Sequence, residues 1–264
     1  MDVHELLGMI LSDFRSRLAT DSAAQHIIKN GSKMTDLPRL SQILGRHLTA
    51  AVESSIKDYP FPFGADEMQQ IAEDILDPVM RESCKLLDDV FIKIQRQIDK
   101  KNGINFEPVL SKYQATRAKQ IYLSAADPLA KKETILRRLS VPPATLVNNH
   151  VDHTMQSNAK LRNEAGFETY IIRTDNGKCC PWCAKITGRY SYPDKTPKDI
   201  FRRHDNCGCT VVYESGNMRQ NVHTKRTWEQ ANVDEQELVR NPKVEVPELK
   251  RGLLTEFLPN DEMR

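Results

Sequence analysis

Apolar residues recur every three or four positions through the first 165 residues, a spacing that places them on one face of a helix. Residues 3–19 follow this pattern with Leu6, Leu7, Ile10, Leu11, Phe14 and Leu18. A second helix is predicted to begin at a cap formed by Asp36 and to continue through Leu40, Ile43, Leu44, Leu48 and Val52. The N-terminal part of the chain is therefore predicted to be a body of packed helices.

The longest helical pattern covers residues 66–101, and the pair Asp77-Pro78 interrupts it. Proline is tolerated in the first turn of a helix but breaks a hydrogen bond inside one. We therefore expect a kink at this point, or two helices with Asp77 as the cap of the second. Further helices are predicted at residues 113–125, 128–139 and 143–165.

Three short segments further along the chain have the alternating, β-branched or aromatic composition of strands. They are residues 167–173, 188–192 and 209–213. A turn is predicted at residues 175–177, Asp-Asn-Gly. A sheet this small rarely folds on apolar burial alone, so a cross-link such as a bound metal is expected.

Two pairs of metal-ligand residues lie in this strand region. The first is Cys-Pro-Trp-Cys at residues 180–183, and the second is His-Asp-Asn-Cys-Gly-Cys at residues 204–209. Two intervening residues let both ligand atoms of a pair turn toward one ion, as in tetrahedral zinc sites. Gly208 is expected to supply a backbone conformation that only glycine tolerates. The predicted zinc ligands are Cys180, Cys183, His204 and Cys207, with Cys209 as an alternative ligand.

Other readings of these cysteines fit the sequence less well. A redox dithiol needs a long helix after the motif, where this chain has Pro193 and Pro197. Disulfides require secretion, and residues 1–5 show no basic region of a signal peptide. A zinc deaminase needs proline before its Cys pair and an upstream His-x-Glu, whereas the nearest match is His-Val-Asp at residues 150–152. Five of the six cysteines lie within residues 179–209, which unrelated buried thiols would not explain.

Four protein ligands close the coordination shell of zinc, so the predicted Zn²⁺ is structural. The predicted fold class is α+β, with a mainly helical N-terminal body and a small C-terminal zinc-stabilised β-containing module. We place the helical body at residues 1–141 and the connecting helix plus zinc module at residues 142–226. Residues 227–264 are charged and contain three prolines, a composition that is typical of tails. They are therefore predicted to form an appended arm or tail.

Charge is distributed unevenly along a chain whose net charge is only +2. Residues 179–226 contain nine Lys and Arg against four Asp and Glu, a local charge of +5. The four residues Lys185, Arg189, Arg202 and Arg203 are candidate contacts for nucleic acid or another anionic partner. The same charges are equally consistent with a solvated basic face that offsets the thiolates. The mean hydropathy of −0.56 indicates a soluble protein, and no apolar run approaches the length of a membrane span.

Polar residues line one face of the predicted helix at residues 143–165. His150 and His153 are three positions apart and share that face, but Asp152 points elsewhere and cannot complete a metal site with them. We expect these polar residues to pack against the zinc module or a neighbouring subunit.

The order of elements across residues 144–215 resembles the C-terminal region of phage minor head proteins of the phage Mu F type. A polar helix ends at Gly166, a strand follows, and then come Cys-Pro-x-Cys, a Gly-aromatic strand at residues 188–190 and His-x-x-Cys-x-Cys. The family has proline where this chain has Asp205, and an Arg-Thr-Glu step where this chain has residues 153–155, His-Thr-Met. The match covers under a third of the chain.

The resemblance implies a virion component in the phage head, made in the bacterial cytoplasm and associated with portal or inner capsid proteins. Such proteins are thought to aid head assembly or to accompany DNA during packaging or ejection. The implied role is structural and non-enzymatic. The alternatives are a zinc-containing nuclease or toxin-like enzyme, and a zinc adaptor that binds nucleic acid. The enzyme would need a catalytic set, for which His204, Asp205 and His223 are the candidates. The adaptor would need several metal-binding Cys/His turns or a recognition helix that enters a groove of the nucleic acid.

Overall fold

The computed structural model describes residues 3–57, 70–125, 131–175, 177 and 179–218. Residues 1–218 form one compact unit, and the second unit, residues 219–264, lies outside the described residues. The predicted tail at residues 227–264 and the candidate His223 therefore also lie outside them. In the described part of the chain, no helix is both long and apolar enough to cross a membrane.

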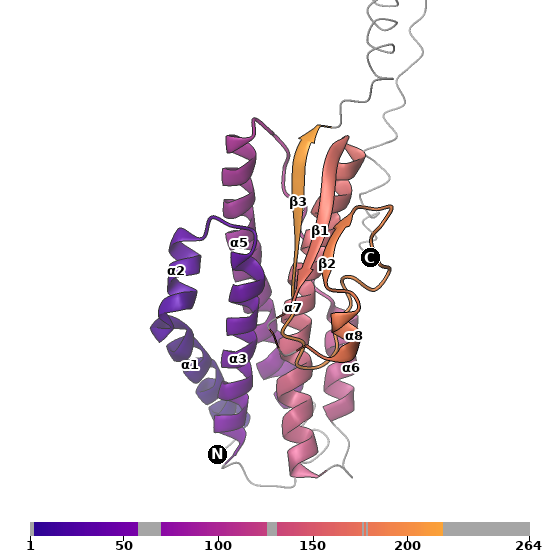
Figure 1. Ribbon diagram of the computed structural model, residues 1–264. Coiled ribbons are helices and arrows are strands. Elements are labelled where there is room, and N and C mark those ends of the chain that lie inside the picture. The colour runs from indigo at the N-terminus through magenta and orange to yellow at the C-terminus, as the bar shows by residue number, and fades with distance from the viewer. Residues whose placement is uncertain (1–2, 58–69, 126–130, 176, 178, 219–264) are drawn as a thin grey trace, which may run out of the picture. The chain divides into compact units, whose positions relative to one another are not determined.

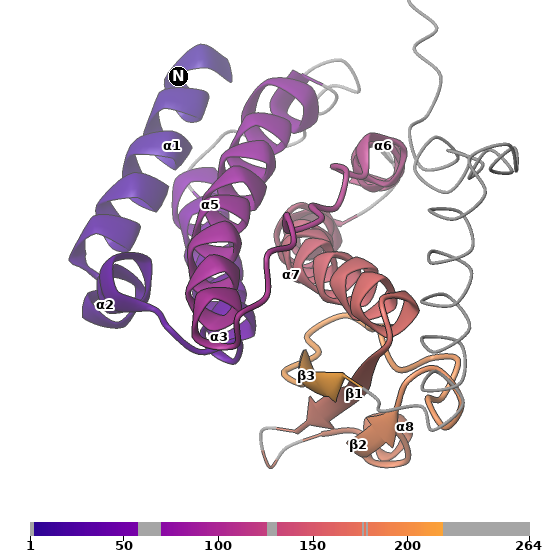
Figure 2. The ribbon, with the colours of Figure 1, turned by 90° about the horizontal axis from the view of Figure 1, so that it is seen from above.

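The described unit consists mainly of helices, with one small sheet at its C-terminal end (Figure 1). The helical elements before the sheet are α1 (Val3–Thr20), α2 (Ser22–Asn30), α3 (Asp36–Ile56), the π-helix η1 (Ile71–Leu76), α5 (Asp77–Lys101), α6 (Ala115–Ala125) and α7 (Lys132–Glu164). Seen from above, α1 and α2 lie on one side and the sheet on the other, with α3, α5 and α7 between them (Figure 2). The expected mainly helical α+β architecture is thus observed.

Helix α3 packs closely along α7, and together they form the centre of the unit. Leu40, Leu44 and Leu48 are fully buried on the inner face of α3, as the apolar spacing predicts. Gly45 permits the close approach, because a Cβ atom at this position would lie 3.1 Å from the Ala144 Cβ. The carboxylate of Asp36, the first residue of α3, accepts backbone hydrogen bonds from residues 32 and 33. It orders the turn before the helix, whereas the cap position itself is residue 35.

The interruption predicted at Asp77-Pro78 is observed as a change of helix type. The π-helix η1 ends at Leu76 and α5 begins at Asp77, with Pro78 in its first turn, where no backbone donor is needed. Leu76, not Asp77, is the cap residue. The Asp77 carboxylate instead accepts a hydrogen bond of 2.7 Å from the Tyr113 hydroxyl.

Helix α7 corrects the expectation of two helices at residues 128–139 and 143–165. It runs without a break from Lys132 to Glu164, with Pro142 and Pro143 inside it. Leu139 and Leu146 are buried on either side of the prolines, so packing holds the segment helical against its local propensity. The helix also crosses the predicted domain boundary at residues 141 and 142, and one apolar core continues from the helices into the sheet.

The three predicted strands are observed, and they form an antiparallel sheet in the order β2-β1-β3. They are β1 (Phe167–Thr174), β2 (Gly188–Ser191) and β3 (Thr210–Met218). Burial alternates along β1, so Phe167, Ile171 and Arg173 all face inward. The short helix α8 (Pro181–Ala184) and the Cys/His residues lie in the connections between these strands.

A buried polar network joins the sheet to the helices. The guanidinium of Arg162 on α7 donates two hydrogen bonds of 2.7 Å to the Asp99 carboxylate of α5. Its Nε atom donates to the Tyr213 hydroxyl on β3 at 3.1 Å, and that hydroxyl donates to the Gln95 side chain. Because both members of the ion pair are almost fully buried, this network fixes the relative positions of α5, α7 and β3.

Candidate metal centre

Two tight turns bring the candidate ligands together. In the first turn, the backbone N–H of Cys183 donates to the Cys180 sulfur, and Pro181 begins the short helix α8. In the second turn, the Cys207 N–H donates to the His204 carbonyl at 3.2 Å. Asn206 supplies the left-handed backbone of this turn, with φ of 58°, so the expectation that Gly208 does so is wrong.

The distances between ligand atoms are close to those around a tetrahedral ion. His204 Nε2 lies 3.3 Å from Cys180 Sγ and 3.2 Å from Cys183 Sγ. Cys183 Sγ lies 3.8 Å from Cys207 Sγ. Zn–S bonds of about 2.3 Å and Zn–N bonds of about 2.0–2.1 Å imply edges of about 3.8 Å between sulfurs and about 3.6 Å between sulfur and nitrogen. Cys180, Cys183 and His204 could therefore hold a metal ion, and Cys207 belongs to a second such group through Cys183.

The ligand atoms form two groups that share Cys183. Cys180, Cys183 and His204 make one group, and Cys183, Cys207 and Cys209 make the other. Within each group all ligand atoms lie within 4.8 Å of one another. All six cysteines of the chain are free thiols, so no disulfide competes for these sulfurs.

Hydrogen bonds around the cluster fix the state of its histidine. His204 Nδ1 lies 2.7 Å from the Asp205 carbonyl, which can only accept, so Nδ1 carries the proton. The lone pair of Nε2 is then directed at the two sulfurs of the first group. A carbonyl that orients the far nitrogen is the usual arrangement for a metal-binding histidine.

Arg173 was not identified by the sequence reasoning, yet it lies directly beside the cluster. Its side chain is fully buried, and Nη1 donates to the carbonyls of Ile200 at 2.5 Å and Arg202 at 3.0 Å. Its Nη2 atom lies 3.6 Å from Cys183 Sγ and 3.5 Å from Cys207 Sγ. Among the described residues, no carboxylate lies within ion-pair distance of this guanidinium. A buried positive charge needs a negative partner, and the nearby sulfurs can supply it only as thiolates.

The sulfur chemistry of the metal-free chain follows from burial and hydrogen bonding. The backbone N–H of Cys183 lowers the pKa of the Cys180 thiol to about 7. Burial raises the pKa of the Cys183 thiol to about 12, and it also raises the pKa of Cys209. A metal ion must displace these protons to bind, so metal binding at this site releases protons.

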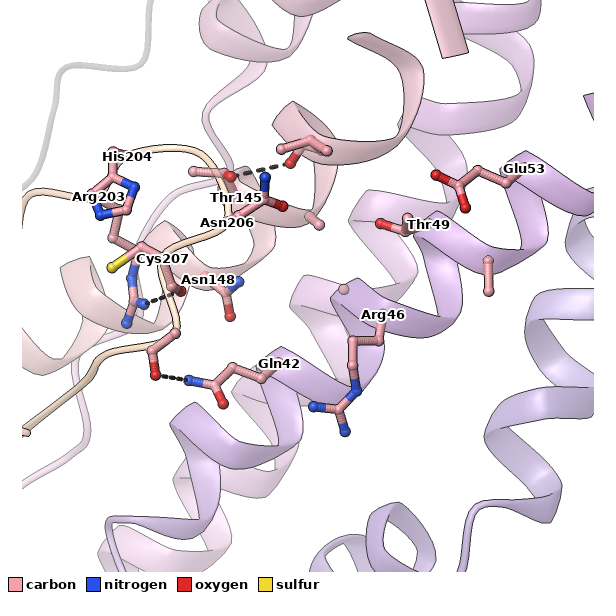
Figure 3. Close-up of a pocket in the computed structure, with 15 residues that line it drawn as sticks. Gln42, Arg46, Thr49, Glu53, Thr145, Asn148, Arg203, His204, Asn206 and Cys207 are labelled. Atoms are coloured by element: carbon pink, nitrogen blue, oxygen red, sulfur yellow. Dashed lines mark hydrogen bonds between the residues drawn. The ribbon is translucent and has the colours of Figure 1, made fainter. Parts of the chain in front are cut away.

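Arg203 fastens the second turn to the helices. It is buried against Asp152 of α7, and its Nη2 atom donates to a carboxylate oxygen at 2.8 Å. Its Nη1 atom also donates to the Cys209 carbonyl at 2.7 Å. Gln42 of α3 holds the same turn through a 3.1 Å bond to the Gly208 carbonyl (Figure 3). Arg203 is therefore inaccessible to a macromolecular partner, which corrects its assignment as an anionic-partner contact.

The other three candidate basic residues are exposed. Arg189 stacks over the Tyr170 ring at 3.4 Å and lies 3.3 Å from the Glu214 carboxylate. Arg202 lies 3.5 Å from the Asp199 carboxylate, and Lys185 is exposed just after α8. The positive charges of both arginines are thus partly offset by exposed carboxylates.

The polar face of α7 was expected to pack against the zinc module or a neighbouring subunit, but its two histidines lie against the helical elements. His150 Nε2 lies 2.8 Å from the Asp88 carboxylate of α5, and His153 Nδ1 lies 2.6 Å from the Gln114 side chain. Asp152 packs against the second turn through Arg203. The two histidines bind separate partners and do not share a metal site.

A cavity of about 520 Å³ lies beside the cluster, between α3, α7 and the second turn (Figure 3). Gln42, Arg46 and Thr49 line it from α3, and His204 and Cys207 form part of its wall. The His204 ring uses both nitrogens within the cluster, since Nε2 faces the sulfurs of Cys180 and Cys183 and Nδ1 is bonded to the Asp205 carbonyl. Comparisons with protein-family models, curated proteins and solved structures find no match to this chain.

Proposed function

We propose that Cys180, Cys183, His204 and Cys207 bind one structural Zn²⁺ ion. The observation that carries this proposal is the buried guanidinium of Arg173, which donates to two sulfurs and has no described carboxylate partner. Three thiolates, one neutral imidazole and Zn²⁺ have a net charge of −1, which Arg173 neutralises. Mixed sulfur and nitrogen ligands at tetrahedral spacing favour zinc over hard cations, which prefer oxygen.

Cys207 is the better fourth ligand for this ion. Its sulfur lies at a tetrahedral edge distance from Cys183 Sγ and accepts from Arg173, and its backbone closes the turn with His204. Cys209, in contrast, does not close the turn with His204, and no hydrogen bond from Arg173 to its sulfur is observed among the described residues. The resulting shell has four protein ligands and no open position, so the ion cross-links the two turns and has no catalytic role.

At the level of biology, we propose that this chain is a minor structural protein of a phage head, associated with portal or inner capsid proteins. The support is the order of motifs from the polar helix α7 through both Cys/His turns, together with a Cys/His cluster that could hold a metal ion. The helical elements would provide the docking body. The exposed Lys185, Arg189 and Arg202 would face packaged DNA or an acidic inner surface of the capsid.

Virion composition tests this role. Purified particles from the phage or prophage that encodes the chain should contain it at a copy number near that of the portal protein, measured by quantitative mass spectrometry. A Cys180→Ser chain should be depleted from particles, whereas a Cys84→Ser chain, altered at a buried cysteine of α5, should be incorporated normally. Particles that assemble fully and lack the wild-type chain would overturn the proposal.

DNA contact is tested separately by the salt dependence of binding. Each phosphate contact adds about 0.9 to the slope of log K against log salt, so Lys185→Ala with Arg202→Ala should reduce the slope by about two units at most. A double variant at the exposed Lys100 and Lys119 of the helical body removes the same charge and serves as the control. Equal effects of the two double variants would show that these residues do not direct the binding, and binding that ignores salt, or none at all, would leave only a protein–protein role.

A further inference from the structure

The cluster contains more sulfur than one tetrahedral ion requires. The cluster has five donor residues, four of them around the shared Cys183, and the proposed zinc set leaves Cys209 unused. Cys209 is nevertheless 1% exposed, and its ligand atom lies within 4.8 Å of the Cys183 and Cys207 sulfurs. All three residues of this second group are buried, whereas Cys180 and His204 of the first group are more exposed.

We propose that Cys183, Cys207 and Cys209 form a second, all-sulfur coordination set that takes a soft, three-coordinate ion of the Cu(I) class. This set overlaps the zinc set at Cys183 and Cys207, so the two ions exclude each other. The proposal depends on the proposed zinc ligands only for the statement that the two ions compete, because both sets use Cys183 and Cys207. The site itself is defined by the three buried sulfurs.

The geometry suits a three-coordinate ion. Metal–sulfur bonds of about 2.3 Å in a trigonal plane separate the sulfurs by about 4.0 Å. Cys183 Sγ and Cys207 Sγ are 3.8 Å apart, and the third sulfur lies within the same 4.8 Å limit. Thiolate ligands select soft ions such as Cu(I), and this set of three lacks the fourth ligand that zinc takes in structural sites.

The surroundings already stabilise this trithiol set. Arg173 donates to two of its three sulfurs, and Arg203 holds the third residue in place through the Cys209 carbonyl. Three thiolates with Cu(I) carry −2, which Arg173 reduces to −1, whereas the zinc set with Arg173 is neutral. The charge balance therefore favours zinc as the resting occupant, whereas the preference of thiolate ligands for soft ions is what lets Cu(I) displace it.

The exchange involves no change of oxidation state. Cu(I) forms bonds to the three sulfurs, Zn²⁺ is released, and the Cys209 thiol gives up its proton. Cys180 and His204 lose their bonds to zinc, and Cys180 is free to take up a proton. The transfer therefore requires only Cu(I) as the incoming ion and water as the proton carrier.

Paired variants of the full chain separate the two sets. Zinc-loaded protein is titrated anaerobically with Cu(I) in the presence of a chromophoric Cu(I) chelator, while a zinc indicator records release. Cys209→Ser should keep wild-type zinc affinity and lose Cu(I) affinity by about tenfold or more. His204→Ala should lose zinc affinity by about a hundredfold or more and keep its Cu(I) affinity. Cys84→Ser, remote from the cluster on α5, should match wild type for both ions.

Several results would overturn the inference. They are wild-type Cu(I) affinity in Cys209→Ser, loss of zinc affinity in Cys209→Ser, or equal loss of both ions in His204→Ala. Should His204→Ala fail to fold, Cys180→Ser removes the other residue confined to the zinc set and is read in the same way. Absence of zinc binding in wild type, with Cys209-dependent Cu(I) binding retained, would instead refute the proposed zinc site and leave this inference standing.

Discussion

Replacing Arg173 with methionine should weaken zinc binding without touching a metal ligand. Methionine keeps much of the apolar length of the side chain but removes the guanidinium that donates to Cys183 Sγ and Cys207 Sγ. Loss of such an outer hydrogen-bond partner usually costs 10–100-fold in metal affinity, which corresponds to about 1.4–2.7 kcal/mol. Because zinc and its ligands would then keep an unneutralised charge of −1, we expect a loss near the upper end of this range.

The same substitution should affect stability differently with and without the ion. In zinc-loaded protein it removes charge-assisted bonds to the Ile200 and Arg202 carbonyls, each worth about 1.5–3 kcal/mol. In metal-free protein with protonated thiols, the guanidinium is a buried charge without a described anionic partner, so removing it offsets part of that loss. Arg173→Met should therefore lower the free energy of unfolding more in the zinc-loaded state than in the metal-free state.

Competition with a chromophoric zinc chelator measures the affinity, and urea unfolding with and without zinc measures the stability. Arg189→Met is the matched control, since this exposed arginine of β2 makes only surface contacts with Tyr170 and Glu214 and should leave zinc affinity unchanged. Arg173→Lys keeps the charge but not the planar fork, so an intermediate affinity is expected. The reasoning is refuted if Arg173→Met binds zinc as tightly as Arg189→Met.

Three further outcomes are expected. Asp152→Asn should lower the free energy of unfolding by about 3–5 kcal/mol in urea denaturation, because it leaves Arg203 buried without its partner; a change under 1 kcal/mol would contradict the pairing. Chelation of the metal should expose residues 179–209 to protease while far-UV helicity persists, since most of the apolar core lies between the helices; simultaneous loss of both would contradict this local role. Zinc affinity, measured by competition, should fall as pH drops from 8 to 6, because the ligands are thiolates when zinc is bound. In the metal-free form burial raises the pKa of the Cys183 thiol to about 12, so this thiol must lose a proton before it can bind zinc. An affinity independent of pH would argue against thiolate ligands.

Local patterns in the sequence predicted the elements whose determinants are themselves local. Apolar spacing predicted α1, α3 and α5, and β-branched alternation predicted β1. Helix α2 was missed because its nine residues are too short for a clear period, although Asp21 caps it by accepting from the Ala24 N–H. The unbroken α7 was missed because only burial against α3, which a local pattern does not report, holds Pro142 and Pro143 in a helix.

In the candidate site, too, features set by neighbouring residues were predicted, and features set by contacts distant in sequence were missed. Ligand spacing identified the residues that come together, because each turn is set by four consecutive residues. Arg203 was misread as exposed because its partner, Asp152, is 51 positions away. Arg173 did carry a signal, since the two-residue period of β1 places it on the same buried face as Phe167 and Ile171. A charged residue on the apolar face of a strand that precedes a Cys-x-x-Cys motif is a useful marker of thiolates nearby.

The most direct test of the proposed metal centre is zinc quantification together with X-ray absorption at the zinc edge on protein purified without chelator. We predict one zinc per chain, with three sulfur ligands at about 2.3 Å and one nitrogen at about 2.0 Å. Cys207→Ser should reduce the sulfur count to two, and Cys209→Ser should leave it at three. A natively folded chain that contains no zinc, or a zinc shell that loses sulfur only in Cys209→Ser, would contradict the proposed set of Cys180, Cys183, His204 and Cys207.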